Sequence, residues 1–539
     1  MKQGFRQSMA WLHTWTGLLV GWVLLLIFMA GTASYFRDEI SRWMRPELPR
    51  AQLGTDAVAA RAIALLERQA PQSPQWTVSL PGARSSFAQL FWRNPPPADG
   101  SAQSRKQMFG DALLDPLSGQ ASAARDTRGG EFFYRLHFDL HYIPVLWARY
   151  IVGFCAMFML VAIISGVITH KKIFKDFFTF RPAKGQRSWL DFHNVSAVLA
   201  LPYHAMITYT GLVTLMLMYL PWGIKVAYPD AEEAFYAEAF SQPQNSREAS
   251  GQPGTRLPIA RLLDVARAEW GAQAPIAGFS LYNPGDAAAV IEIRQGDGQR
   301  LAYDAPTLLL DAGNGQILAR SGSAGAAAQT RNTLYGLHLA HFAGPGLRWL
   351  FFGSGLLGCL MVASGVILWA VKERPKHAKA GRIGFGLRLV DALNIGTVAG
   401  LPIAFAAYFW GNRLIPAHAT ERPEQEAAAF FLAWAAALIA AFVWPRRAMW
   451  AWQLYLGAAL FALLPVLNAA TTDAHLGNSL PARDWALAGV DLVCCALGCV
   501  LALAARRMQR WQPPLSAAER RARERAAARP VASAALEAP

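Results

Sequence analysis

Eight long runs of mostly apolar residues constrain this chain more than any other feature of its sequence. A helix needs about 20 such residues to cross a hydrocarbon layer about 30 Å thick. Since 53% of the 539 residues are hydrophobic and only 16% are charged, we expect a polytopic membrane protein. The first run continues into charged sequence without a convincing cleavage site, which argues against a signal peptide. The expected spans are residues 9–35, 145–170, 193–222, 347–371, 391–412, 427–444, 449–469 and 484–505.

The positions of lysine and arginine predict the orientation of these spans. The linkers 171–190 and 372–390 each hold six basic residues against one acid, and short basic loops mark the cytoplasmic side of a membrane. Both termini are then cytoplasmic. The long segments 36–144 and 223–346 are external, in the periplasm of a Gram-negative cell. The net charge of +15 therefore reports topology, and we expect a lipid bilayer and no nucleic acid as the partner of this basic chain.

The two external segments predict small α+β domains. Each begins with helical apolar spacing, at residues 55–70 and 257–272. Alternating strands such as "AVIEIRQ" and Asp/Gly turns follow. The predicted fold is mainly α, a membrane protein of about eight transmembrane helices with two small α+β insertions, between helices 1 and 2 and between helices 3 and 4. The predicted parts are helix 1 in 1–36, external domain 1 in 37–136, helices 2 and 3 with their basic loop in 137–222, external domain 2 in 223–337, helix 4 in 338–375, accessory helices 5 to 8 in 376–505 and a basic tail in 506–539.

An internal duplication organises the chain. The external segments end alike, in "LLDPLSGQ" and "LLDAGNGQ", and each is followed by a histidine motif, "YRLHFDLHYIP" or "YGLHLAHFAGPG". The spans that come next share "SGVI". In the spans that precede each external segment, His13 with Gly31 matches His193 with Gly211 at the same spacing. The repeated unit is therefore a helix, an external domain, a histidine motif and a second helix.

A partial third copy begins in the fifth span. "DFHNVSAVLALP" in the third span aligns without a gap to "DALNIGTVAGLP" in the fifth. Leu393 and Ala404 stand where the third span has His193 and His204. Because the third copy lacks both histidines, we expect residues 1–375 to form the functional core.

The histidines are the candidate functional residues. His204 lies inside the third span, where an ionisable group is costly and usually functional. His193, eleven residues earlier, is about three turns plus about 20° away, so the two share one helix face roughly 16 Å apart. Stacked histidines of this kind are typical of b-type cytochromes, in which neutral imidazoles ligate two haems. The candidate ligands are His13, His137, His141, His170, His193, His204, His338 and His341.

We therefore expect about two haem b groups. His170 and His193 are the expected ligands on the cytoplasmic side, with His13 as a competitor for the second place, and the external motifs provide partners for His204. All five cysteines lie in predicted spans and no C-x-x-C-H motif occurs, so neither a thioether link nor a disulfide framework is expected. A zinc site in the first external motif would lack a third ligand. A proton relay through His204 is a further alternative.

The "WLHTWTGLLVG" start, the two "LLD" segment ends, the "LH" motifs and the "SGV" of spans two and four resemble the PepSY-associated transmembrane family over roughly residues 1–375. Its members include bacterial iron-regulated inner-membrane proteins and ferric-siderophore reductases. The resemblance implies two PepSY-like external domains and a haem-bearing oxidoreductase of the inner membrane. Such a protein passes electrons to periplasmic ferric-siderophore. Reduction to Fe(II) releases the metal for uptake, because oxygen-rich chelators bind Fe(II) far more weakly.

The sequence leaves the electron donor and two other functions open. It contains no flavin or NAD(P)H module after the last span, and no catalytic triad, P-loop or metalloprotease motif. The donor is therefore expected to be a separate cytoplasmic protein or a quinol. The alternatives are a quinol-linked b-type cytochrome for another periplasmic acceptor, and a non-enzymatic anchor whose external domains bind a peptide or a peptidase.

Overall fold

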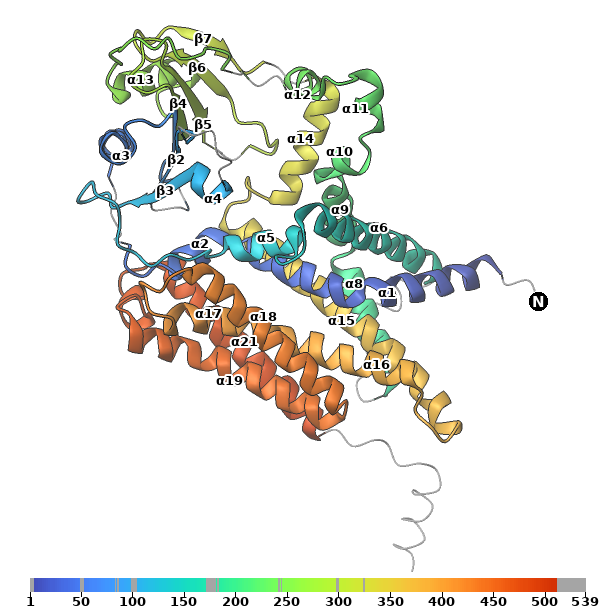
Figure 1. The fold of residues 1–539 in the computed structure, drawn as a ribbon. Helices are drawn as coiled ribbons and strands as arrows, with labels where there is room; N and C mark the ends of the chain where they lie inside the picture. The colour runs from blue at the N-terminus through green and yellow to red at the C-terminus, as the bar shows by residue number, and fades with distance from the viewer. Residues whose placement is uncertain are drawn as a thin grey trace, which may run out of the picture.

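The chain forms a bundle of long helices that carries a β-sheet domain at one end (Figure 1). In the computed structural model the described residues are 4–48, 53–82, 84, 87–97, 104–170, 181, 184–240, 243, 245–296, 300–322 and 325–510. We call the end of the bundle next to the sheet the sheet end, and the opposite end the far end. The amino-terminal end of α1 lies at the far end.

Each of the eight predicted spans corresponds to a long apolar helix or to a helix pair. Among the described residues, seven segments are long and apolar enough to cross a membrane singly, and one bent pair makes the eighth. The prediction of a multi-pass membrane protein is thus confirmed. The seven segments are α1 (Phe5–Ser34), α6 (Val145–Thr169), α15 (Pro345–Lys379), α16–η1–α17 (Phe385–Asn394, Ile395–Ala399 and Gly400–Leu414), α18 (Arg422–Val443), α19 (Arg447–Thr471) and α21 (Trp485–Arg510).

The bent pair consists of α8 (Gln186–Leu199) and α9 (Leu201–Thr214), whose axes differ by 67°. Pro202 explains the break, because proline has no N–H to continue the helical bonding and its ring clashes with the preceding turn. The helix therefore restarts at Leu201 with proline in its first turn. This bend separates His193 on α8 from His204 on α9.

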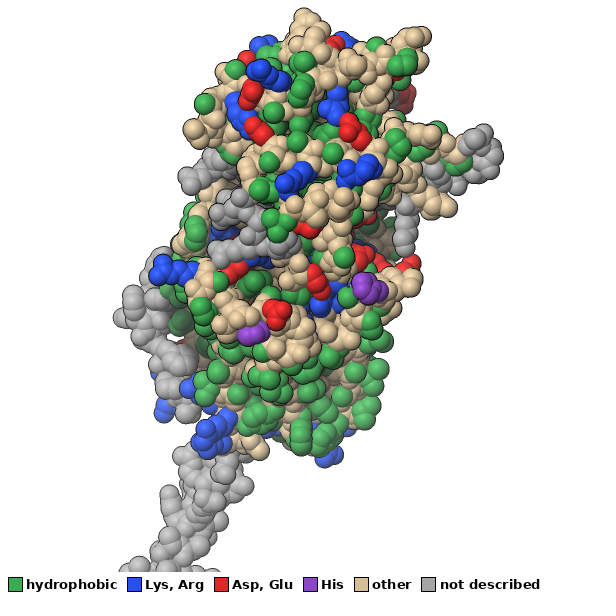
Figure 2. All heavy atoms as spheres, turned by 90° about the vertical axis from the view of Figure 1, so that its left-hand side faces the viewer, with side chains coloured by type: hydrophobic (Ala, Val, Ile, Leu, Met, Phe, Trp, Pro, Cys, Tyr) green, Lys and Arg blue, Asp and Glu red, His purple; other side chains and the backbone are tan. Residues whose placement is uncertain are grey.

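A belt of hydrophobic side chains covers the lower part of the face shown in Figure 2, with Lys and Arg side chains below it and charges of both signs above it. Many large apolar side chains in this part of the chain are exposed, for example Leu432 at 69% and Val443 at 79%. Such a surface is suited to lipid and not to water. Most of the basic linker 171–190 and nearly all of the tail 506–539 lie outside the described residues.

The two external segments share one seven-stranded antiparallel sheet, whereas the sequence suggested two separate small domains. The strand order is β3-β2-β1-β4-β5-β6-β7, so the segments meet where β1 pairs with β4. Helices α3 and α13 pack with the sheet in one hydrophobic core. The strands are β1 (Gln75–Ser79), β2 (Ala88–Arg93), β3 (Phe109–Leu114), β4 (Ile276–Tyr282), β5 (Val290–Gln295), β6 (Thr307–Asp311) and β7 (Ile317–Arg320).

Shorter helices connect the sheet domain to the bundle. The most important are α5, which precedes α6, and α14, which precedes α15, because they carry the two histidine motifs. The shorter helices are α2 (Arg37–Trp43), α3 (Thr55–Gln69), α4 (Arg105–Met108), α5 (Glu131–Asp139), α10 (Met216–Tyr219), α11 (Trp222–Ala227), α12 (Glu232–Phe240), α13 (Ile259–Trp270), α14 (Ala326–Leu339) and α20 (Leu476–Ser479).

The shared sheet can be tested by a disulfide across the β1–β4 junction. Thr77 faces Ser280 in the register, and their hydroxyl oxygens are 3.1 Å apart. Directly opposed cross-strand residues have the Cβ spacing of a disulfide. We expect Thr77→Cys with Ser280→Cys to form a bond on mild oxidation, so that fragments cut between the two segments stay joined until reduction. Thr77→Cys with Glu292→Cys, on a strand that does not pair with β1, is the control. Equal cross-linking of both pairs would contradict the shared sheet.

Candidate functional site

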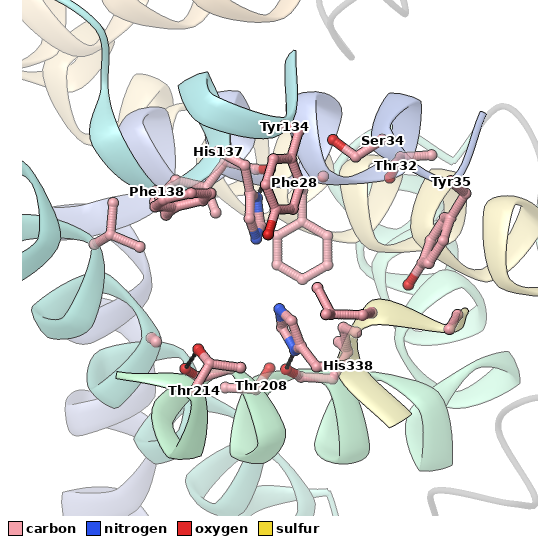
Figure 3. Close-up of a pocket in the computed structure, with 18 of the residues that line it drawn as sticks. Phe28, Thr32, Ser34, Tyr35, Tyr134, His137, Phe138, Thr208, Thr214 and His338 are labelled. Carbon is pink, nitrogen blue, oxygen red and sulfur yellow. Dashed lines mark hydrogen bonds between the residues drawn. The ribbon is translucent and has the colours of Figure 1, made fainter. Parts of the chain in front are cut away.

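At the sheet end, α5 and α14 bring the rings of His137 and His338 edge to edge (Figure 3), with ring centroids 6.1 Å apart and planes inclined by 34°. The Nδ1 of His137 lies 2.7 Å from the carbonyl oxygen of Ile27 in α1. The Nδ1 of His338 lies 3.1 Å from the carbonyl oxygen of Ile207 in α9. A carbonyl can only accept a hydrogen bond, so each Nδ1 carries the proton and each Nε2 keeps a free lone pair. The edge of each ring that carries Nε2 faces a cavity that both histidines line.

Toward the far end, α1 and α8 bring His13 and His193 together in the same way. Their ring centroids are also 6.1 Å apart, with planes inclined by 66°. The Nδ1 of His13 lies 2.8 Å from the carbonyl oxygen of Ala162 in α6, and that of His193 lies 2.9 Å from the carbonyl oxygen of Met361 in α15. The four histidines therefore form two pairs, the sheet-end pair (His137, His338) and the far-end pair (His13, His193).

Each histidine of the sheet-end pair lies against a glycine that follows its carbonyl partner by four residues. A Cβ at Gly31 would lie 2.7 Å from the His137 ring, and one at Gly211 would lie 3.0 Å from the His338 ring. Both distances are at or below the closest approach of real Cβ atoms. Glycine is therefore required on α1 and α9, because the ring must approach the helix closely enough to reach a carbonyl.

The far-end pair repeats this arrangement. A Cβ at Gly166 of α6 would lie 3.1 Å from the His13 ring, and one at Gly365 of α15 would lie 3.2 Å from the His193 ring. Each of these glycines again follows the accepting carbonyl by four residues. Four helices thus present four similar sockets, each made of a carbonyl and a glycine, and each histidine of one copy faces its equivalent from the other copy.

Both pairs lie in cavities between helices. The sheet-end cavity has a volume of about 170 Å³ and is lined by both histidines together with aromatic residues such as Phe28, Tyr134 and Tyr335. The far-end cavity has a volume of about 430 Å³. Burial lowers the pKa of His137, and it lowers the pKa of His338 to about 3, with a smaller contribution from the neighbouring His137. Both imidazoles at the sheet end are therefore neutral at physiological pH.

His204 and His170 lie outside these two pairs, although the sequence favoured both as ligands. His204 is fully buried and lines the far-end cavity, with its Nε2 3.4 Å from the carbonyl oxygen of Ser354 and Phe28 beside it. His170 ends α6 and its Nε2 lies 3.0 Å from the side-chain amide of Asn194. The sequence predicted that His204 pairs with an external motif and that His170 pairs with His193. The structure instead pairs His13 with His193 and His137 with His338.

The second histidine of each external motif, His141 or His341, also lies outside the pairs. His141 stacks on Phe431 of α18, and its Nε2 lies 3.5 Å from a carboxylate oxygen of Glu424. His341 lines the sheet-end cavity and contacts the ring of Tyr303. Within the described ranges, no group of three or more His, Cys, Asp or Glu side chains is arranged to hold a metal ion. The alternative of a zinc site in the first motif therefore gains no support.

Sequence reasoning found all four paired histidines but missed how they pair and missed the sockets. The signal was present in the duplication, because His13 and Gly31 stand eighteen residues apart just as His193 and Gly211 do. In a duplicated membrane protein, equivalent residues often meet at the interface of the two copies. The helical spacing of His193 and His204, which places them at two depths of one helix, does not reveal that relation.

Comparison with known proteins shows the family to which this chain belongs. The sequence profile of the PepSY-associated TM region matches residues 10–372. The chain belongs to the PepSY-associated transmembrane family. It is also 30% identical over 376 residues to the uncharacterized protein PA4219 of Pseudomonas aeruginosa, a match that covers 66% of this chain and 89% of that protein. The matched region contains both histidine pairs and all four glycine sockets of this PepSY-associated protein.

The helices beyond the matched region hold α5 in place. Phe132 stacks on Tyr408 of α17 with ring centroids 4.4 Å apart, and Phe133 stacks on Phe405 at 4.7 Å. The Tyr408 hydroxyl donates to the carbonyl oxygen of Gly129 at 2.9 Å. The accessory helices of this PepSY-associated protein therefore fix the helix that carries His137.

Buried charges strengthen the same contact. Glu426 of α18 is fully buried and pairs with Arg422, whose guanidinium also donates to the carbonyl oxygen of Asp126 at 2.8 Å. The hydroxyl of Thr127 donates to Glu426 as well. Removing one partner of such a buried pair leaves an uncompensated charge, which is strongly destabilising. The segment just before α5 is thus tied to α18.

This contact can be tested at Tyr408. Tyr408→Ala removes a buried aromatic ring and should lower the stability by about 3–5 kcal/mol. Tyr408→Phe keeps the ring and loses one hydrogen bond, at a cost of about 1 kcal/mol. Leu432→Ala, at an exposed apolar position of α18, is the control and should change little. Thermal unfolding in detergent measures the three variants. Equal unfolding temperatures for Tyr408→Ala and Leu432→Ala would contradict the inference that the accessory helices hold α5 in place.

Proposed function

We propose that this protein binds two haem b groups, one between the histidines of each pair, and reduces ferric-siderophore in the periplasm. The observation that supports this proposal is the repeated separation of 6.1 Å between facing imidazole rings. A metal bound by two imidazole nitrogens at about 2 Å each places the ring centroids about 6 Å apart. Haem iron in b-type cytochromes is commonly held by axial histidines. Two ligands suffice for haem, whereas a protein zinc site needs three or four.

The surrounding groups fit the same cofactor. A hydrogen bond from Nδ1–H to a carbonyl orients a ligating imidazole and makes its other nitrogen a better ligand. All four histidines have such a bond. No cysteine is among the described residues that line either cavity, so the group would be held by axial bonds and packing alone. When bound, it would supply a reversible one-electron carrier at each position.

The two pairs occupy different depths of the bundle. Their positions on α1 are marked by His13 and by Ile27, the carbonyl partner of His137, which are fourteen residues or about 21 Å apart along the helix. Since basic loops mark the cytoplasmic side, the far end faces the cytoplasm and the sheet end faces the periplasm of the inner membrane. The sheet-end pair then lies next to the periplasmic acceptor.

Two arginines that line the sheet-end cavity would have to exchange their ion pairs with Asp38, Glu39 and Glu131 for an anionic iron chelate. These arginines are Arg84, from the loop between β1 and β2, and Arg37 of α2. Arginine binds carboxylate and other oxygen-rich anions through several hydrogen bonds at once. Each transfer to the chelate would convert one Fe(III) to one Fe(II). These residues would position the chelate and attract it, while the iron itself would receive the electron.

Histidine substitutions test the cofactor and the pairing together. We expect His137→Ala or His338→Ala to lower the haem content from about two to about one per chain, and His13→Ala or His193→Ala to remove the other haem. His141→Ala and His170→Ala, in the same segments but outside the pairs, are matched controls and should keep both. Reduced-minus-oxidised spectra measure each variant. A colourless wild-type protein from haem-replete cells would favour the peptide-binding anchor, and haem loss only in the controls would overturn the pairing.

The same variants test the reaction. In proteoliposomes with an electron donor inside, wild-type protein should form Fe(II) from an external ferric-siderophore, and a ferrous-specific chelator reports it. His137→Ala should abolish this activity, while its remaining haem stays reducible by dithionite. Activity with a different external acceptor and none with ferric chelates would favour the other cytochrome function.

The glycine sockets give an independent test. At Gly31 an added Cβ would meet the His137 ring at 2.7 Å, whereas at Gly353 of α15 it would meet nothing within 4 Å. We therefore expect Gly31→Ala to shift or lose the haem of the sheet-end pair, and Gly353→Ala to leave both haems unchanged. Haem content and the position of the α band in reduced spectra distinguish the variants. An unchanged spectrum in Gly31→Ala would contradict the socket.

A further inference from the structure

A third cavity lies at the sheet end, apart from the two histidine pairs. Its volume is about 1020 Å³, which is larger than that of the sheet-end cavity or the far-end cavity. Helices α1 and α15 form one side and α17 and α21 form the other, with α2 and the sheet domain over its mouth. Along α21 it extends from Trp485 to Leu497, which is about 18 Å. It is therefore a long crevice that runs from the membrane surface into the apolar belt.

Aromatic rings line this crevice. They come from both of its sides, and flat rings of this kind pack well against another flat ring. Trp349 and Trp485 at its edges are 47% and 65% exposed, and Leu492 is 44% exposed, so the crevice opens sideways toward lipid. The aromatic lining includes Phe36, Phe133, Trp349, Phe352, Phe405 and Phe409.

The mouth of the crevice is polar, and each of its arginines is paired with a carboxylate: Arg42 with Asp484, and Arg84 and Arg348 with Glu39. Glu39 of α2 accepts hydrogen bonds from Arg84 at 2.9 Å and from Arg348 at 2.5 Å. Arg348 is 8% exposed, and its Nε is buried without a hydrogen-bond partner in the described part of the chain. A phospholipid phosphate would require an excess of positive charge. An uncharged head that accepts from arginine and donates to a carboxylate suits this mouth better.

The crevice adjoins the sheet-end pair. Arg84 and Arg348 line both cavities. Phe133 lines the crevice and precedes His137 by one turn of α5, so the two side chains lie on the same side of that helix. A ligand in the crevice would thus be one layer of side chains away from the histidines.

We propose that this crevice binds a membrane quinol, which serves as the electron donor. A quinol has a flat ring, an uncharged head with two hydroxyl groups and an isoprenoid tail that suits a lipid-facing channel. The inference rests on the proposed function, because the electrons leave through the sheet-end pair. It decides between the two donors that the sequence left open, a cytoplasmic protein and a quinol.

A quinol supplies two electrons, which equals the number of histidine pairs in the protein. Oxidation of one quinol to quinone breaks two O–H bonds and releases two electrons and two protons. The electrons leave singly and reduce two ferric chelates to the ferrous state. The protons pass to the periplasmic water, with the Glu39 carboxylate, 17% exposed at the mouth, as the first acceptor. The two histidine pairs, each the site of one one-electron carrier, would together hold both electrons of one quinol.

A cavity-filling substitution tests the site. Gly489 of α21 lines the crevice, and an added Cβ there would meet nothing within 4 Å. Gly489→Phe should therefore place an aromatic ring in the crevice from a position where the Cβ itself meets no neighbour. Gly353→Phe places the same side chain at an open position of α15 that does not line the crevice, and it is the matched control. Both variants are made in the full-length protein in lipid nanodiscs.

The first measurement is equilibrium binding of decylubiquinone, with free and bound quinone separated and quantified. We expect at least tenfold weaker binding to Gly489→Phe and wild-type binding to Gly353→Phe. The second measurement is the rate of haem reduction by decylubiquinol, which should fall at least tenfold in Gly489→Phe while dithionite still reduces all its haem. The binding measurement separates the two proposals, because a wild-type protein that lacks haem, but whose quinone binding is weakened by Gly489→Phe, contradicts only the proposed function.

Three results would overturn the quinol site. Equal quinone binding by wild type and Gly489→Phe would exclude the crevice. Wild-type protein with two haems that decylubiquinol does not reduce would exclude a quinol donor. A phospholipid that copurifies with wild type, is absent from Gly489→Phe and is not displaced by decylubiquinone would identify the crevice as a lipid site.

Discussion

The arrangement of this membrane bundle depends on one interaction that occurs four times, the hydrogen bond from a histidine Nδ1 to a helix carbonyl across a glycine. A buried imidazole needs a partner for its N–H, and a helix carbonyl can accept a second bond only if the ring comes close to the backbone. Glycine permits that approach at Gly31 and at its three equivalents. The bond fixes the tautomer, so the second nitrogen of each ring is left to face its partner.

The same constraint explains why neither duplicated half forms a histidine pair alone. Each copy provides one histidine of each pair. The accepting carbonyls come from α1, α6, α9 and α15, one from each of the first four spans. The sheet shows the same dependence, since β1 of one segment completes its pairing only on β4 of the other. An open strand edge invites aggregation. Joining the halves therefore removes an exposed edge and assembles both histidine pairs in one step.

The sequence was sufficient for the features that follow from local pattern. Apolar run length predicted every span, and the position of His137 and His338 before helices marked them as candidates. The pairing could not be obtained in this way, because helical periodicity relates residues of one helix only. His193 and His204 share a face in a straight helix, but Pro202 bends the pair by 67°. Contacts such as His13 with His193 join distant segments, so only the duplication could have indicated them.

The third copy shows what the histidines require of their surroundings. Asn394 is aligned with Asn194 and keeps a bridging role: it accepts from the Trp22 indole at 2.9 Å and donates to the Val366 carbonyl at 3.1 Å. Polar bonds of this kind hold membrane helices together. Leu393, next to Asn394, stands where the third span has His193. Ala404 stands where the third span has His204, and it is fully buried. This helix belongs to the most buried of the seven single spans. Leu393 and Ala404 line none of the three cavities, and α17, which carries Ala404, instead supports α5 through Tyr408 and Phe405.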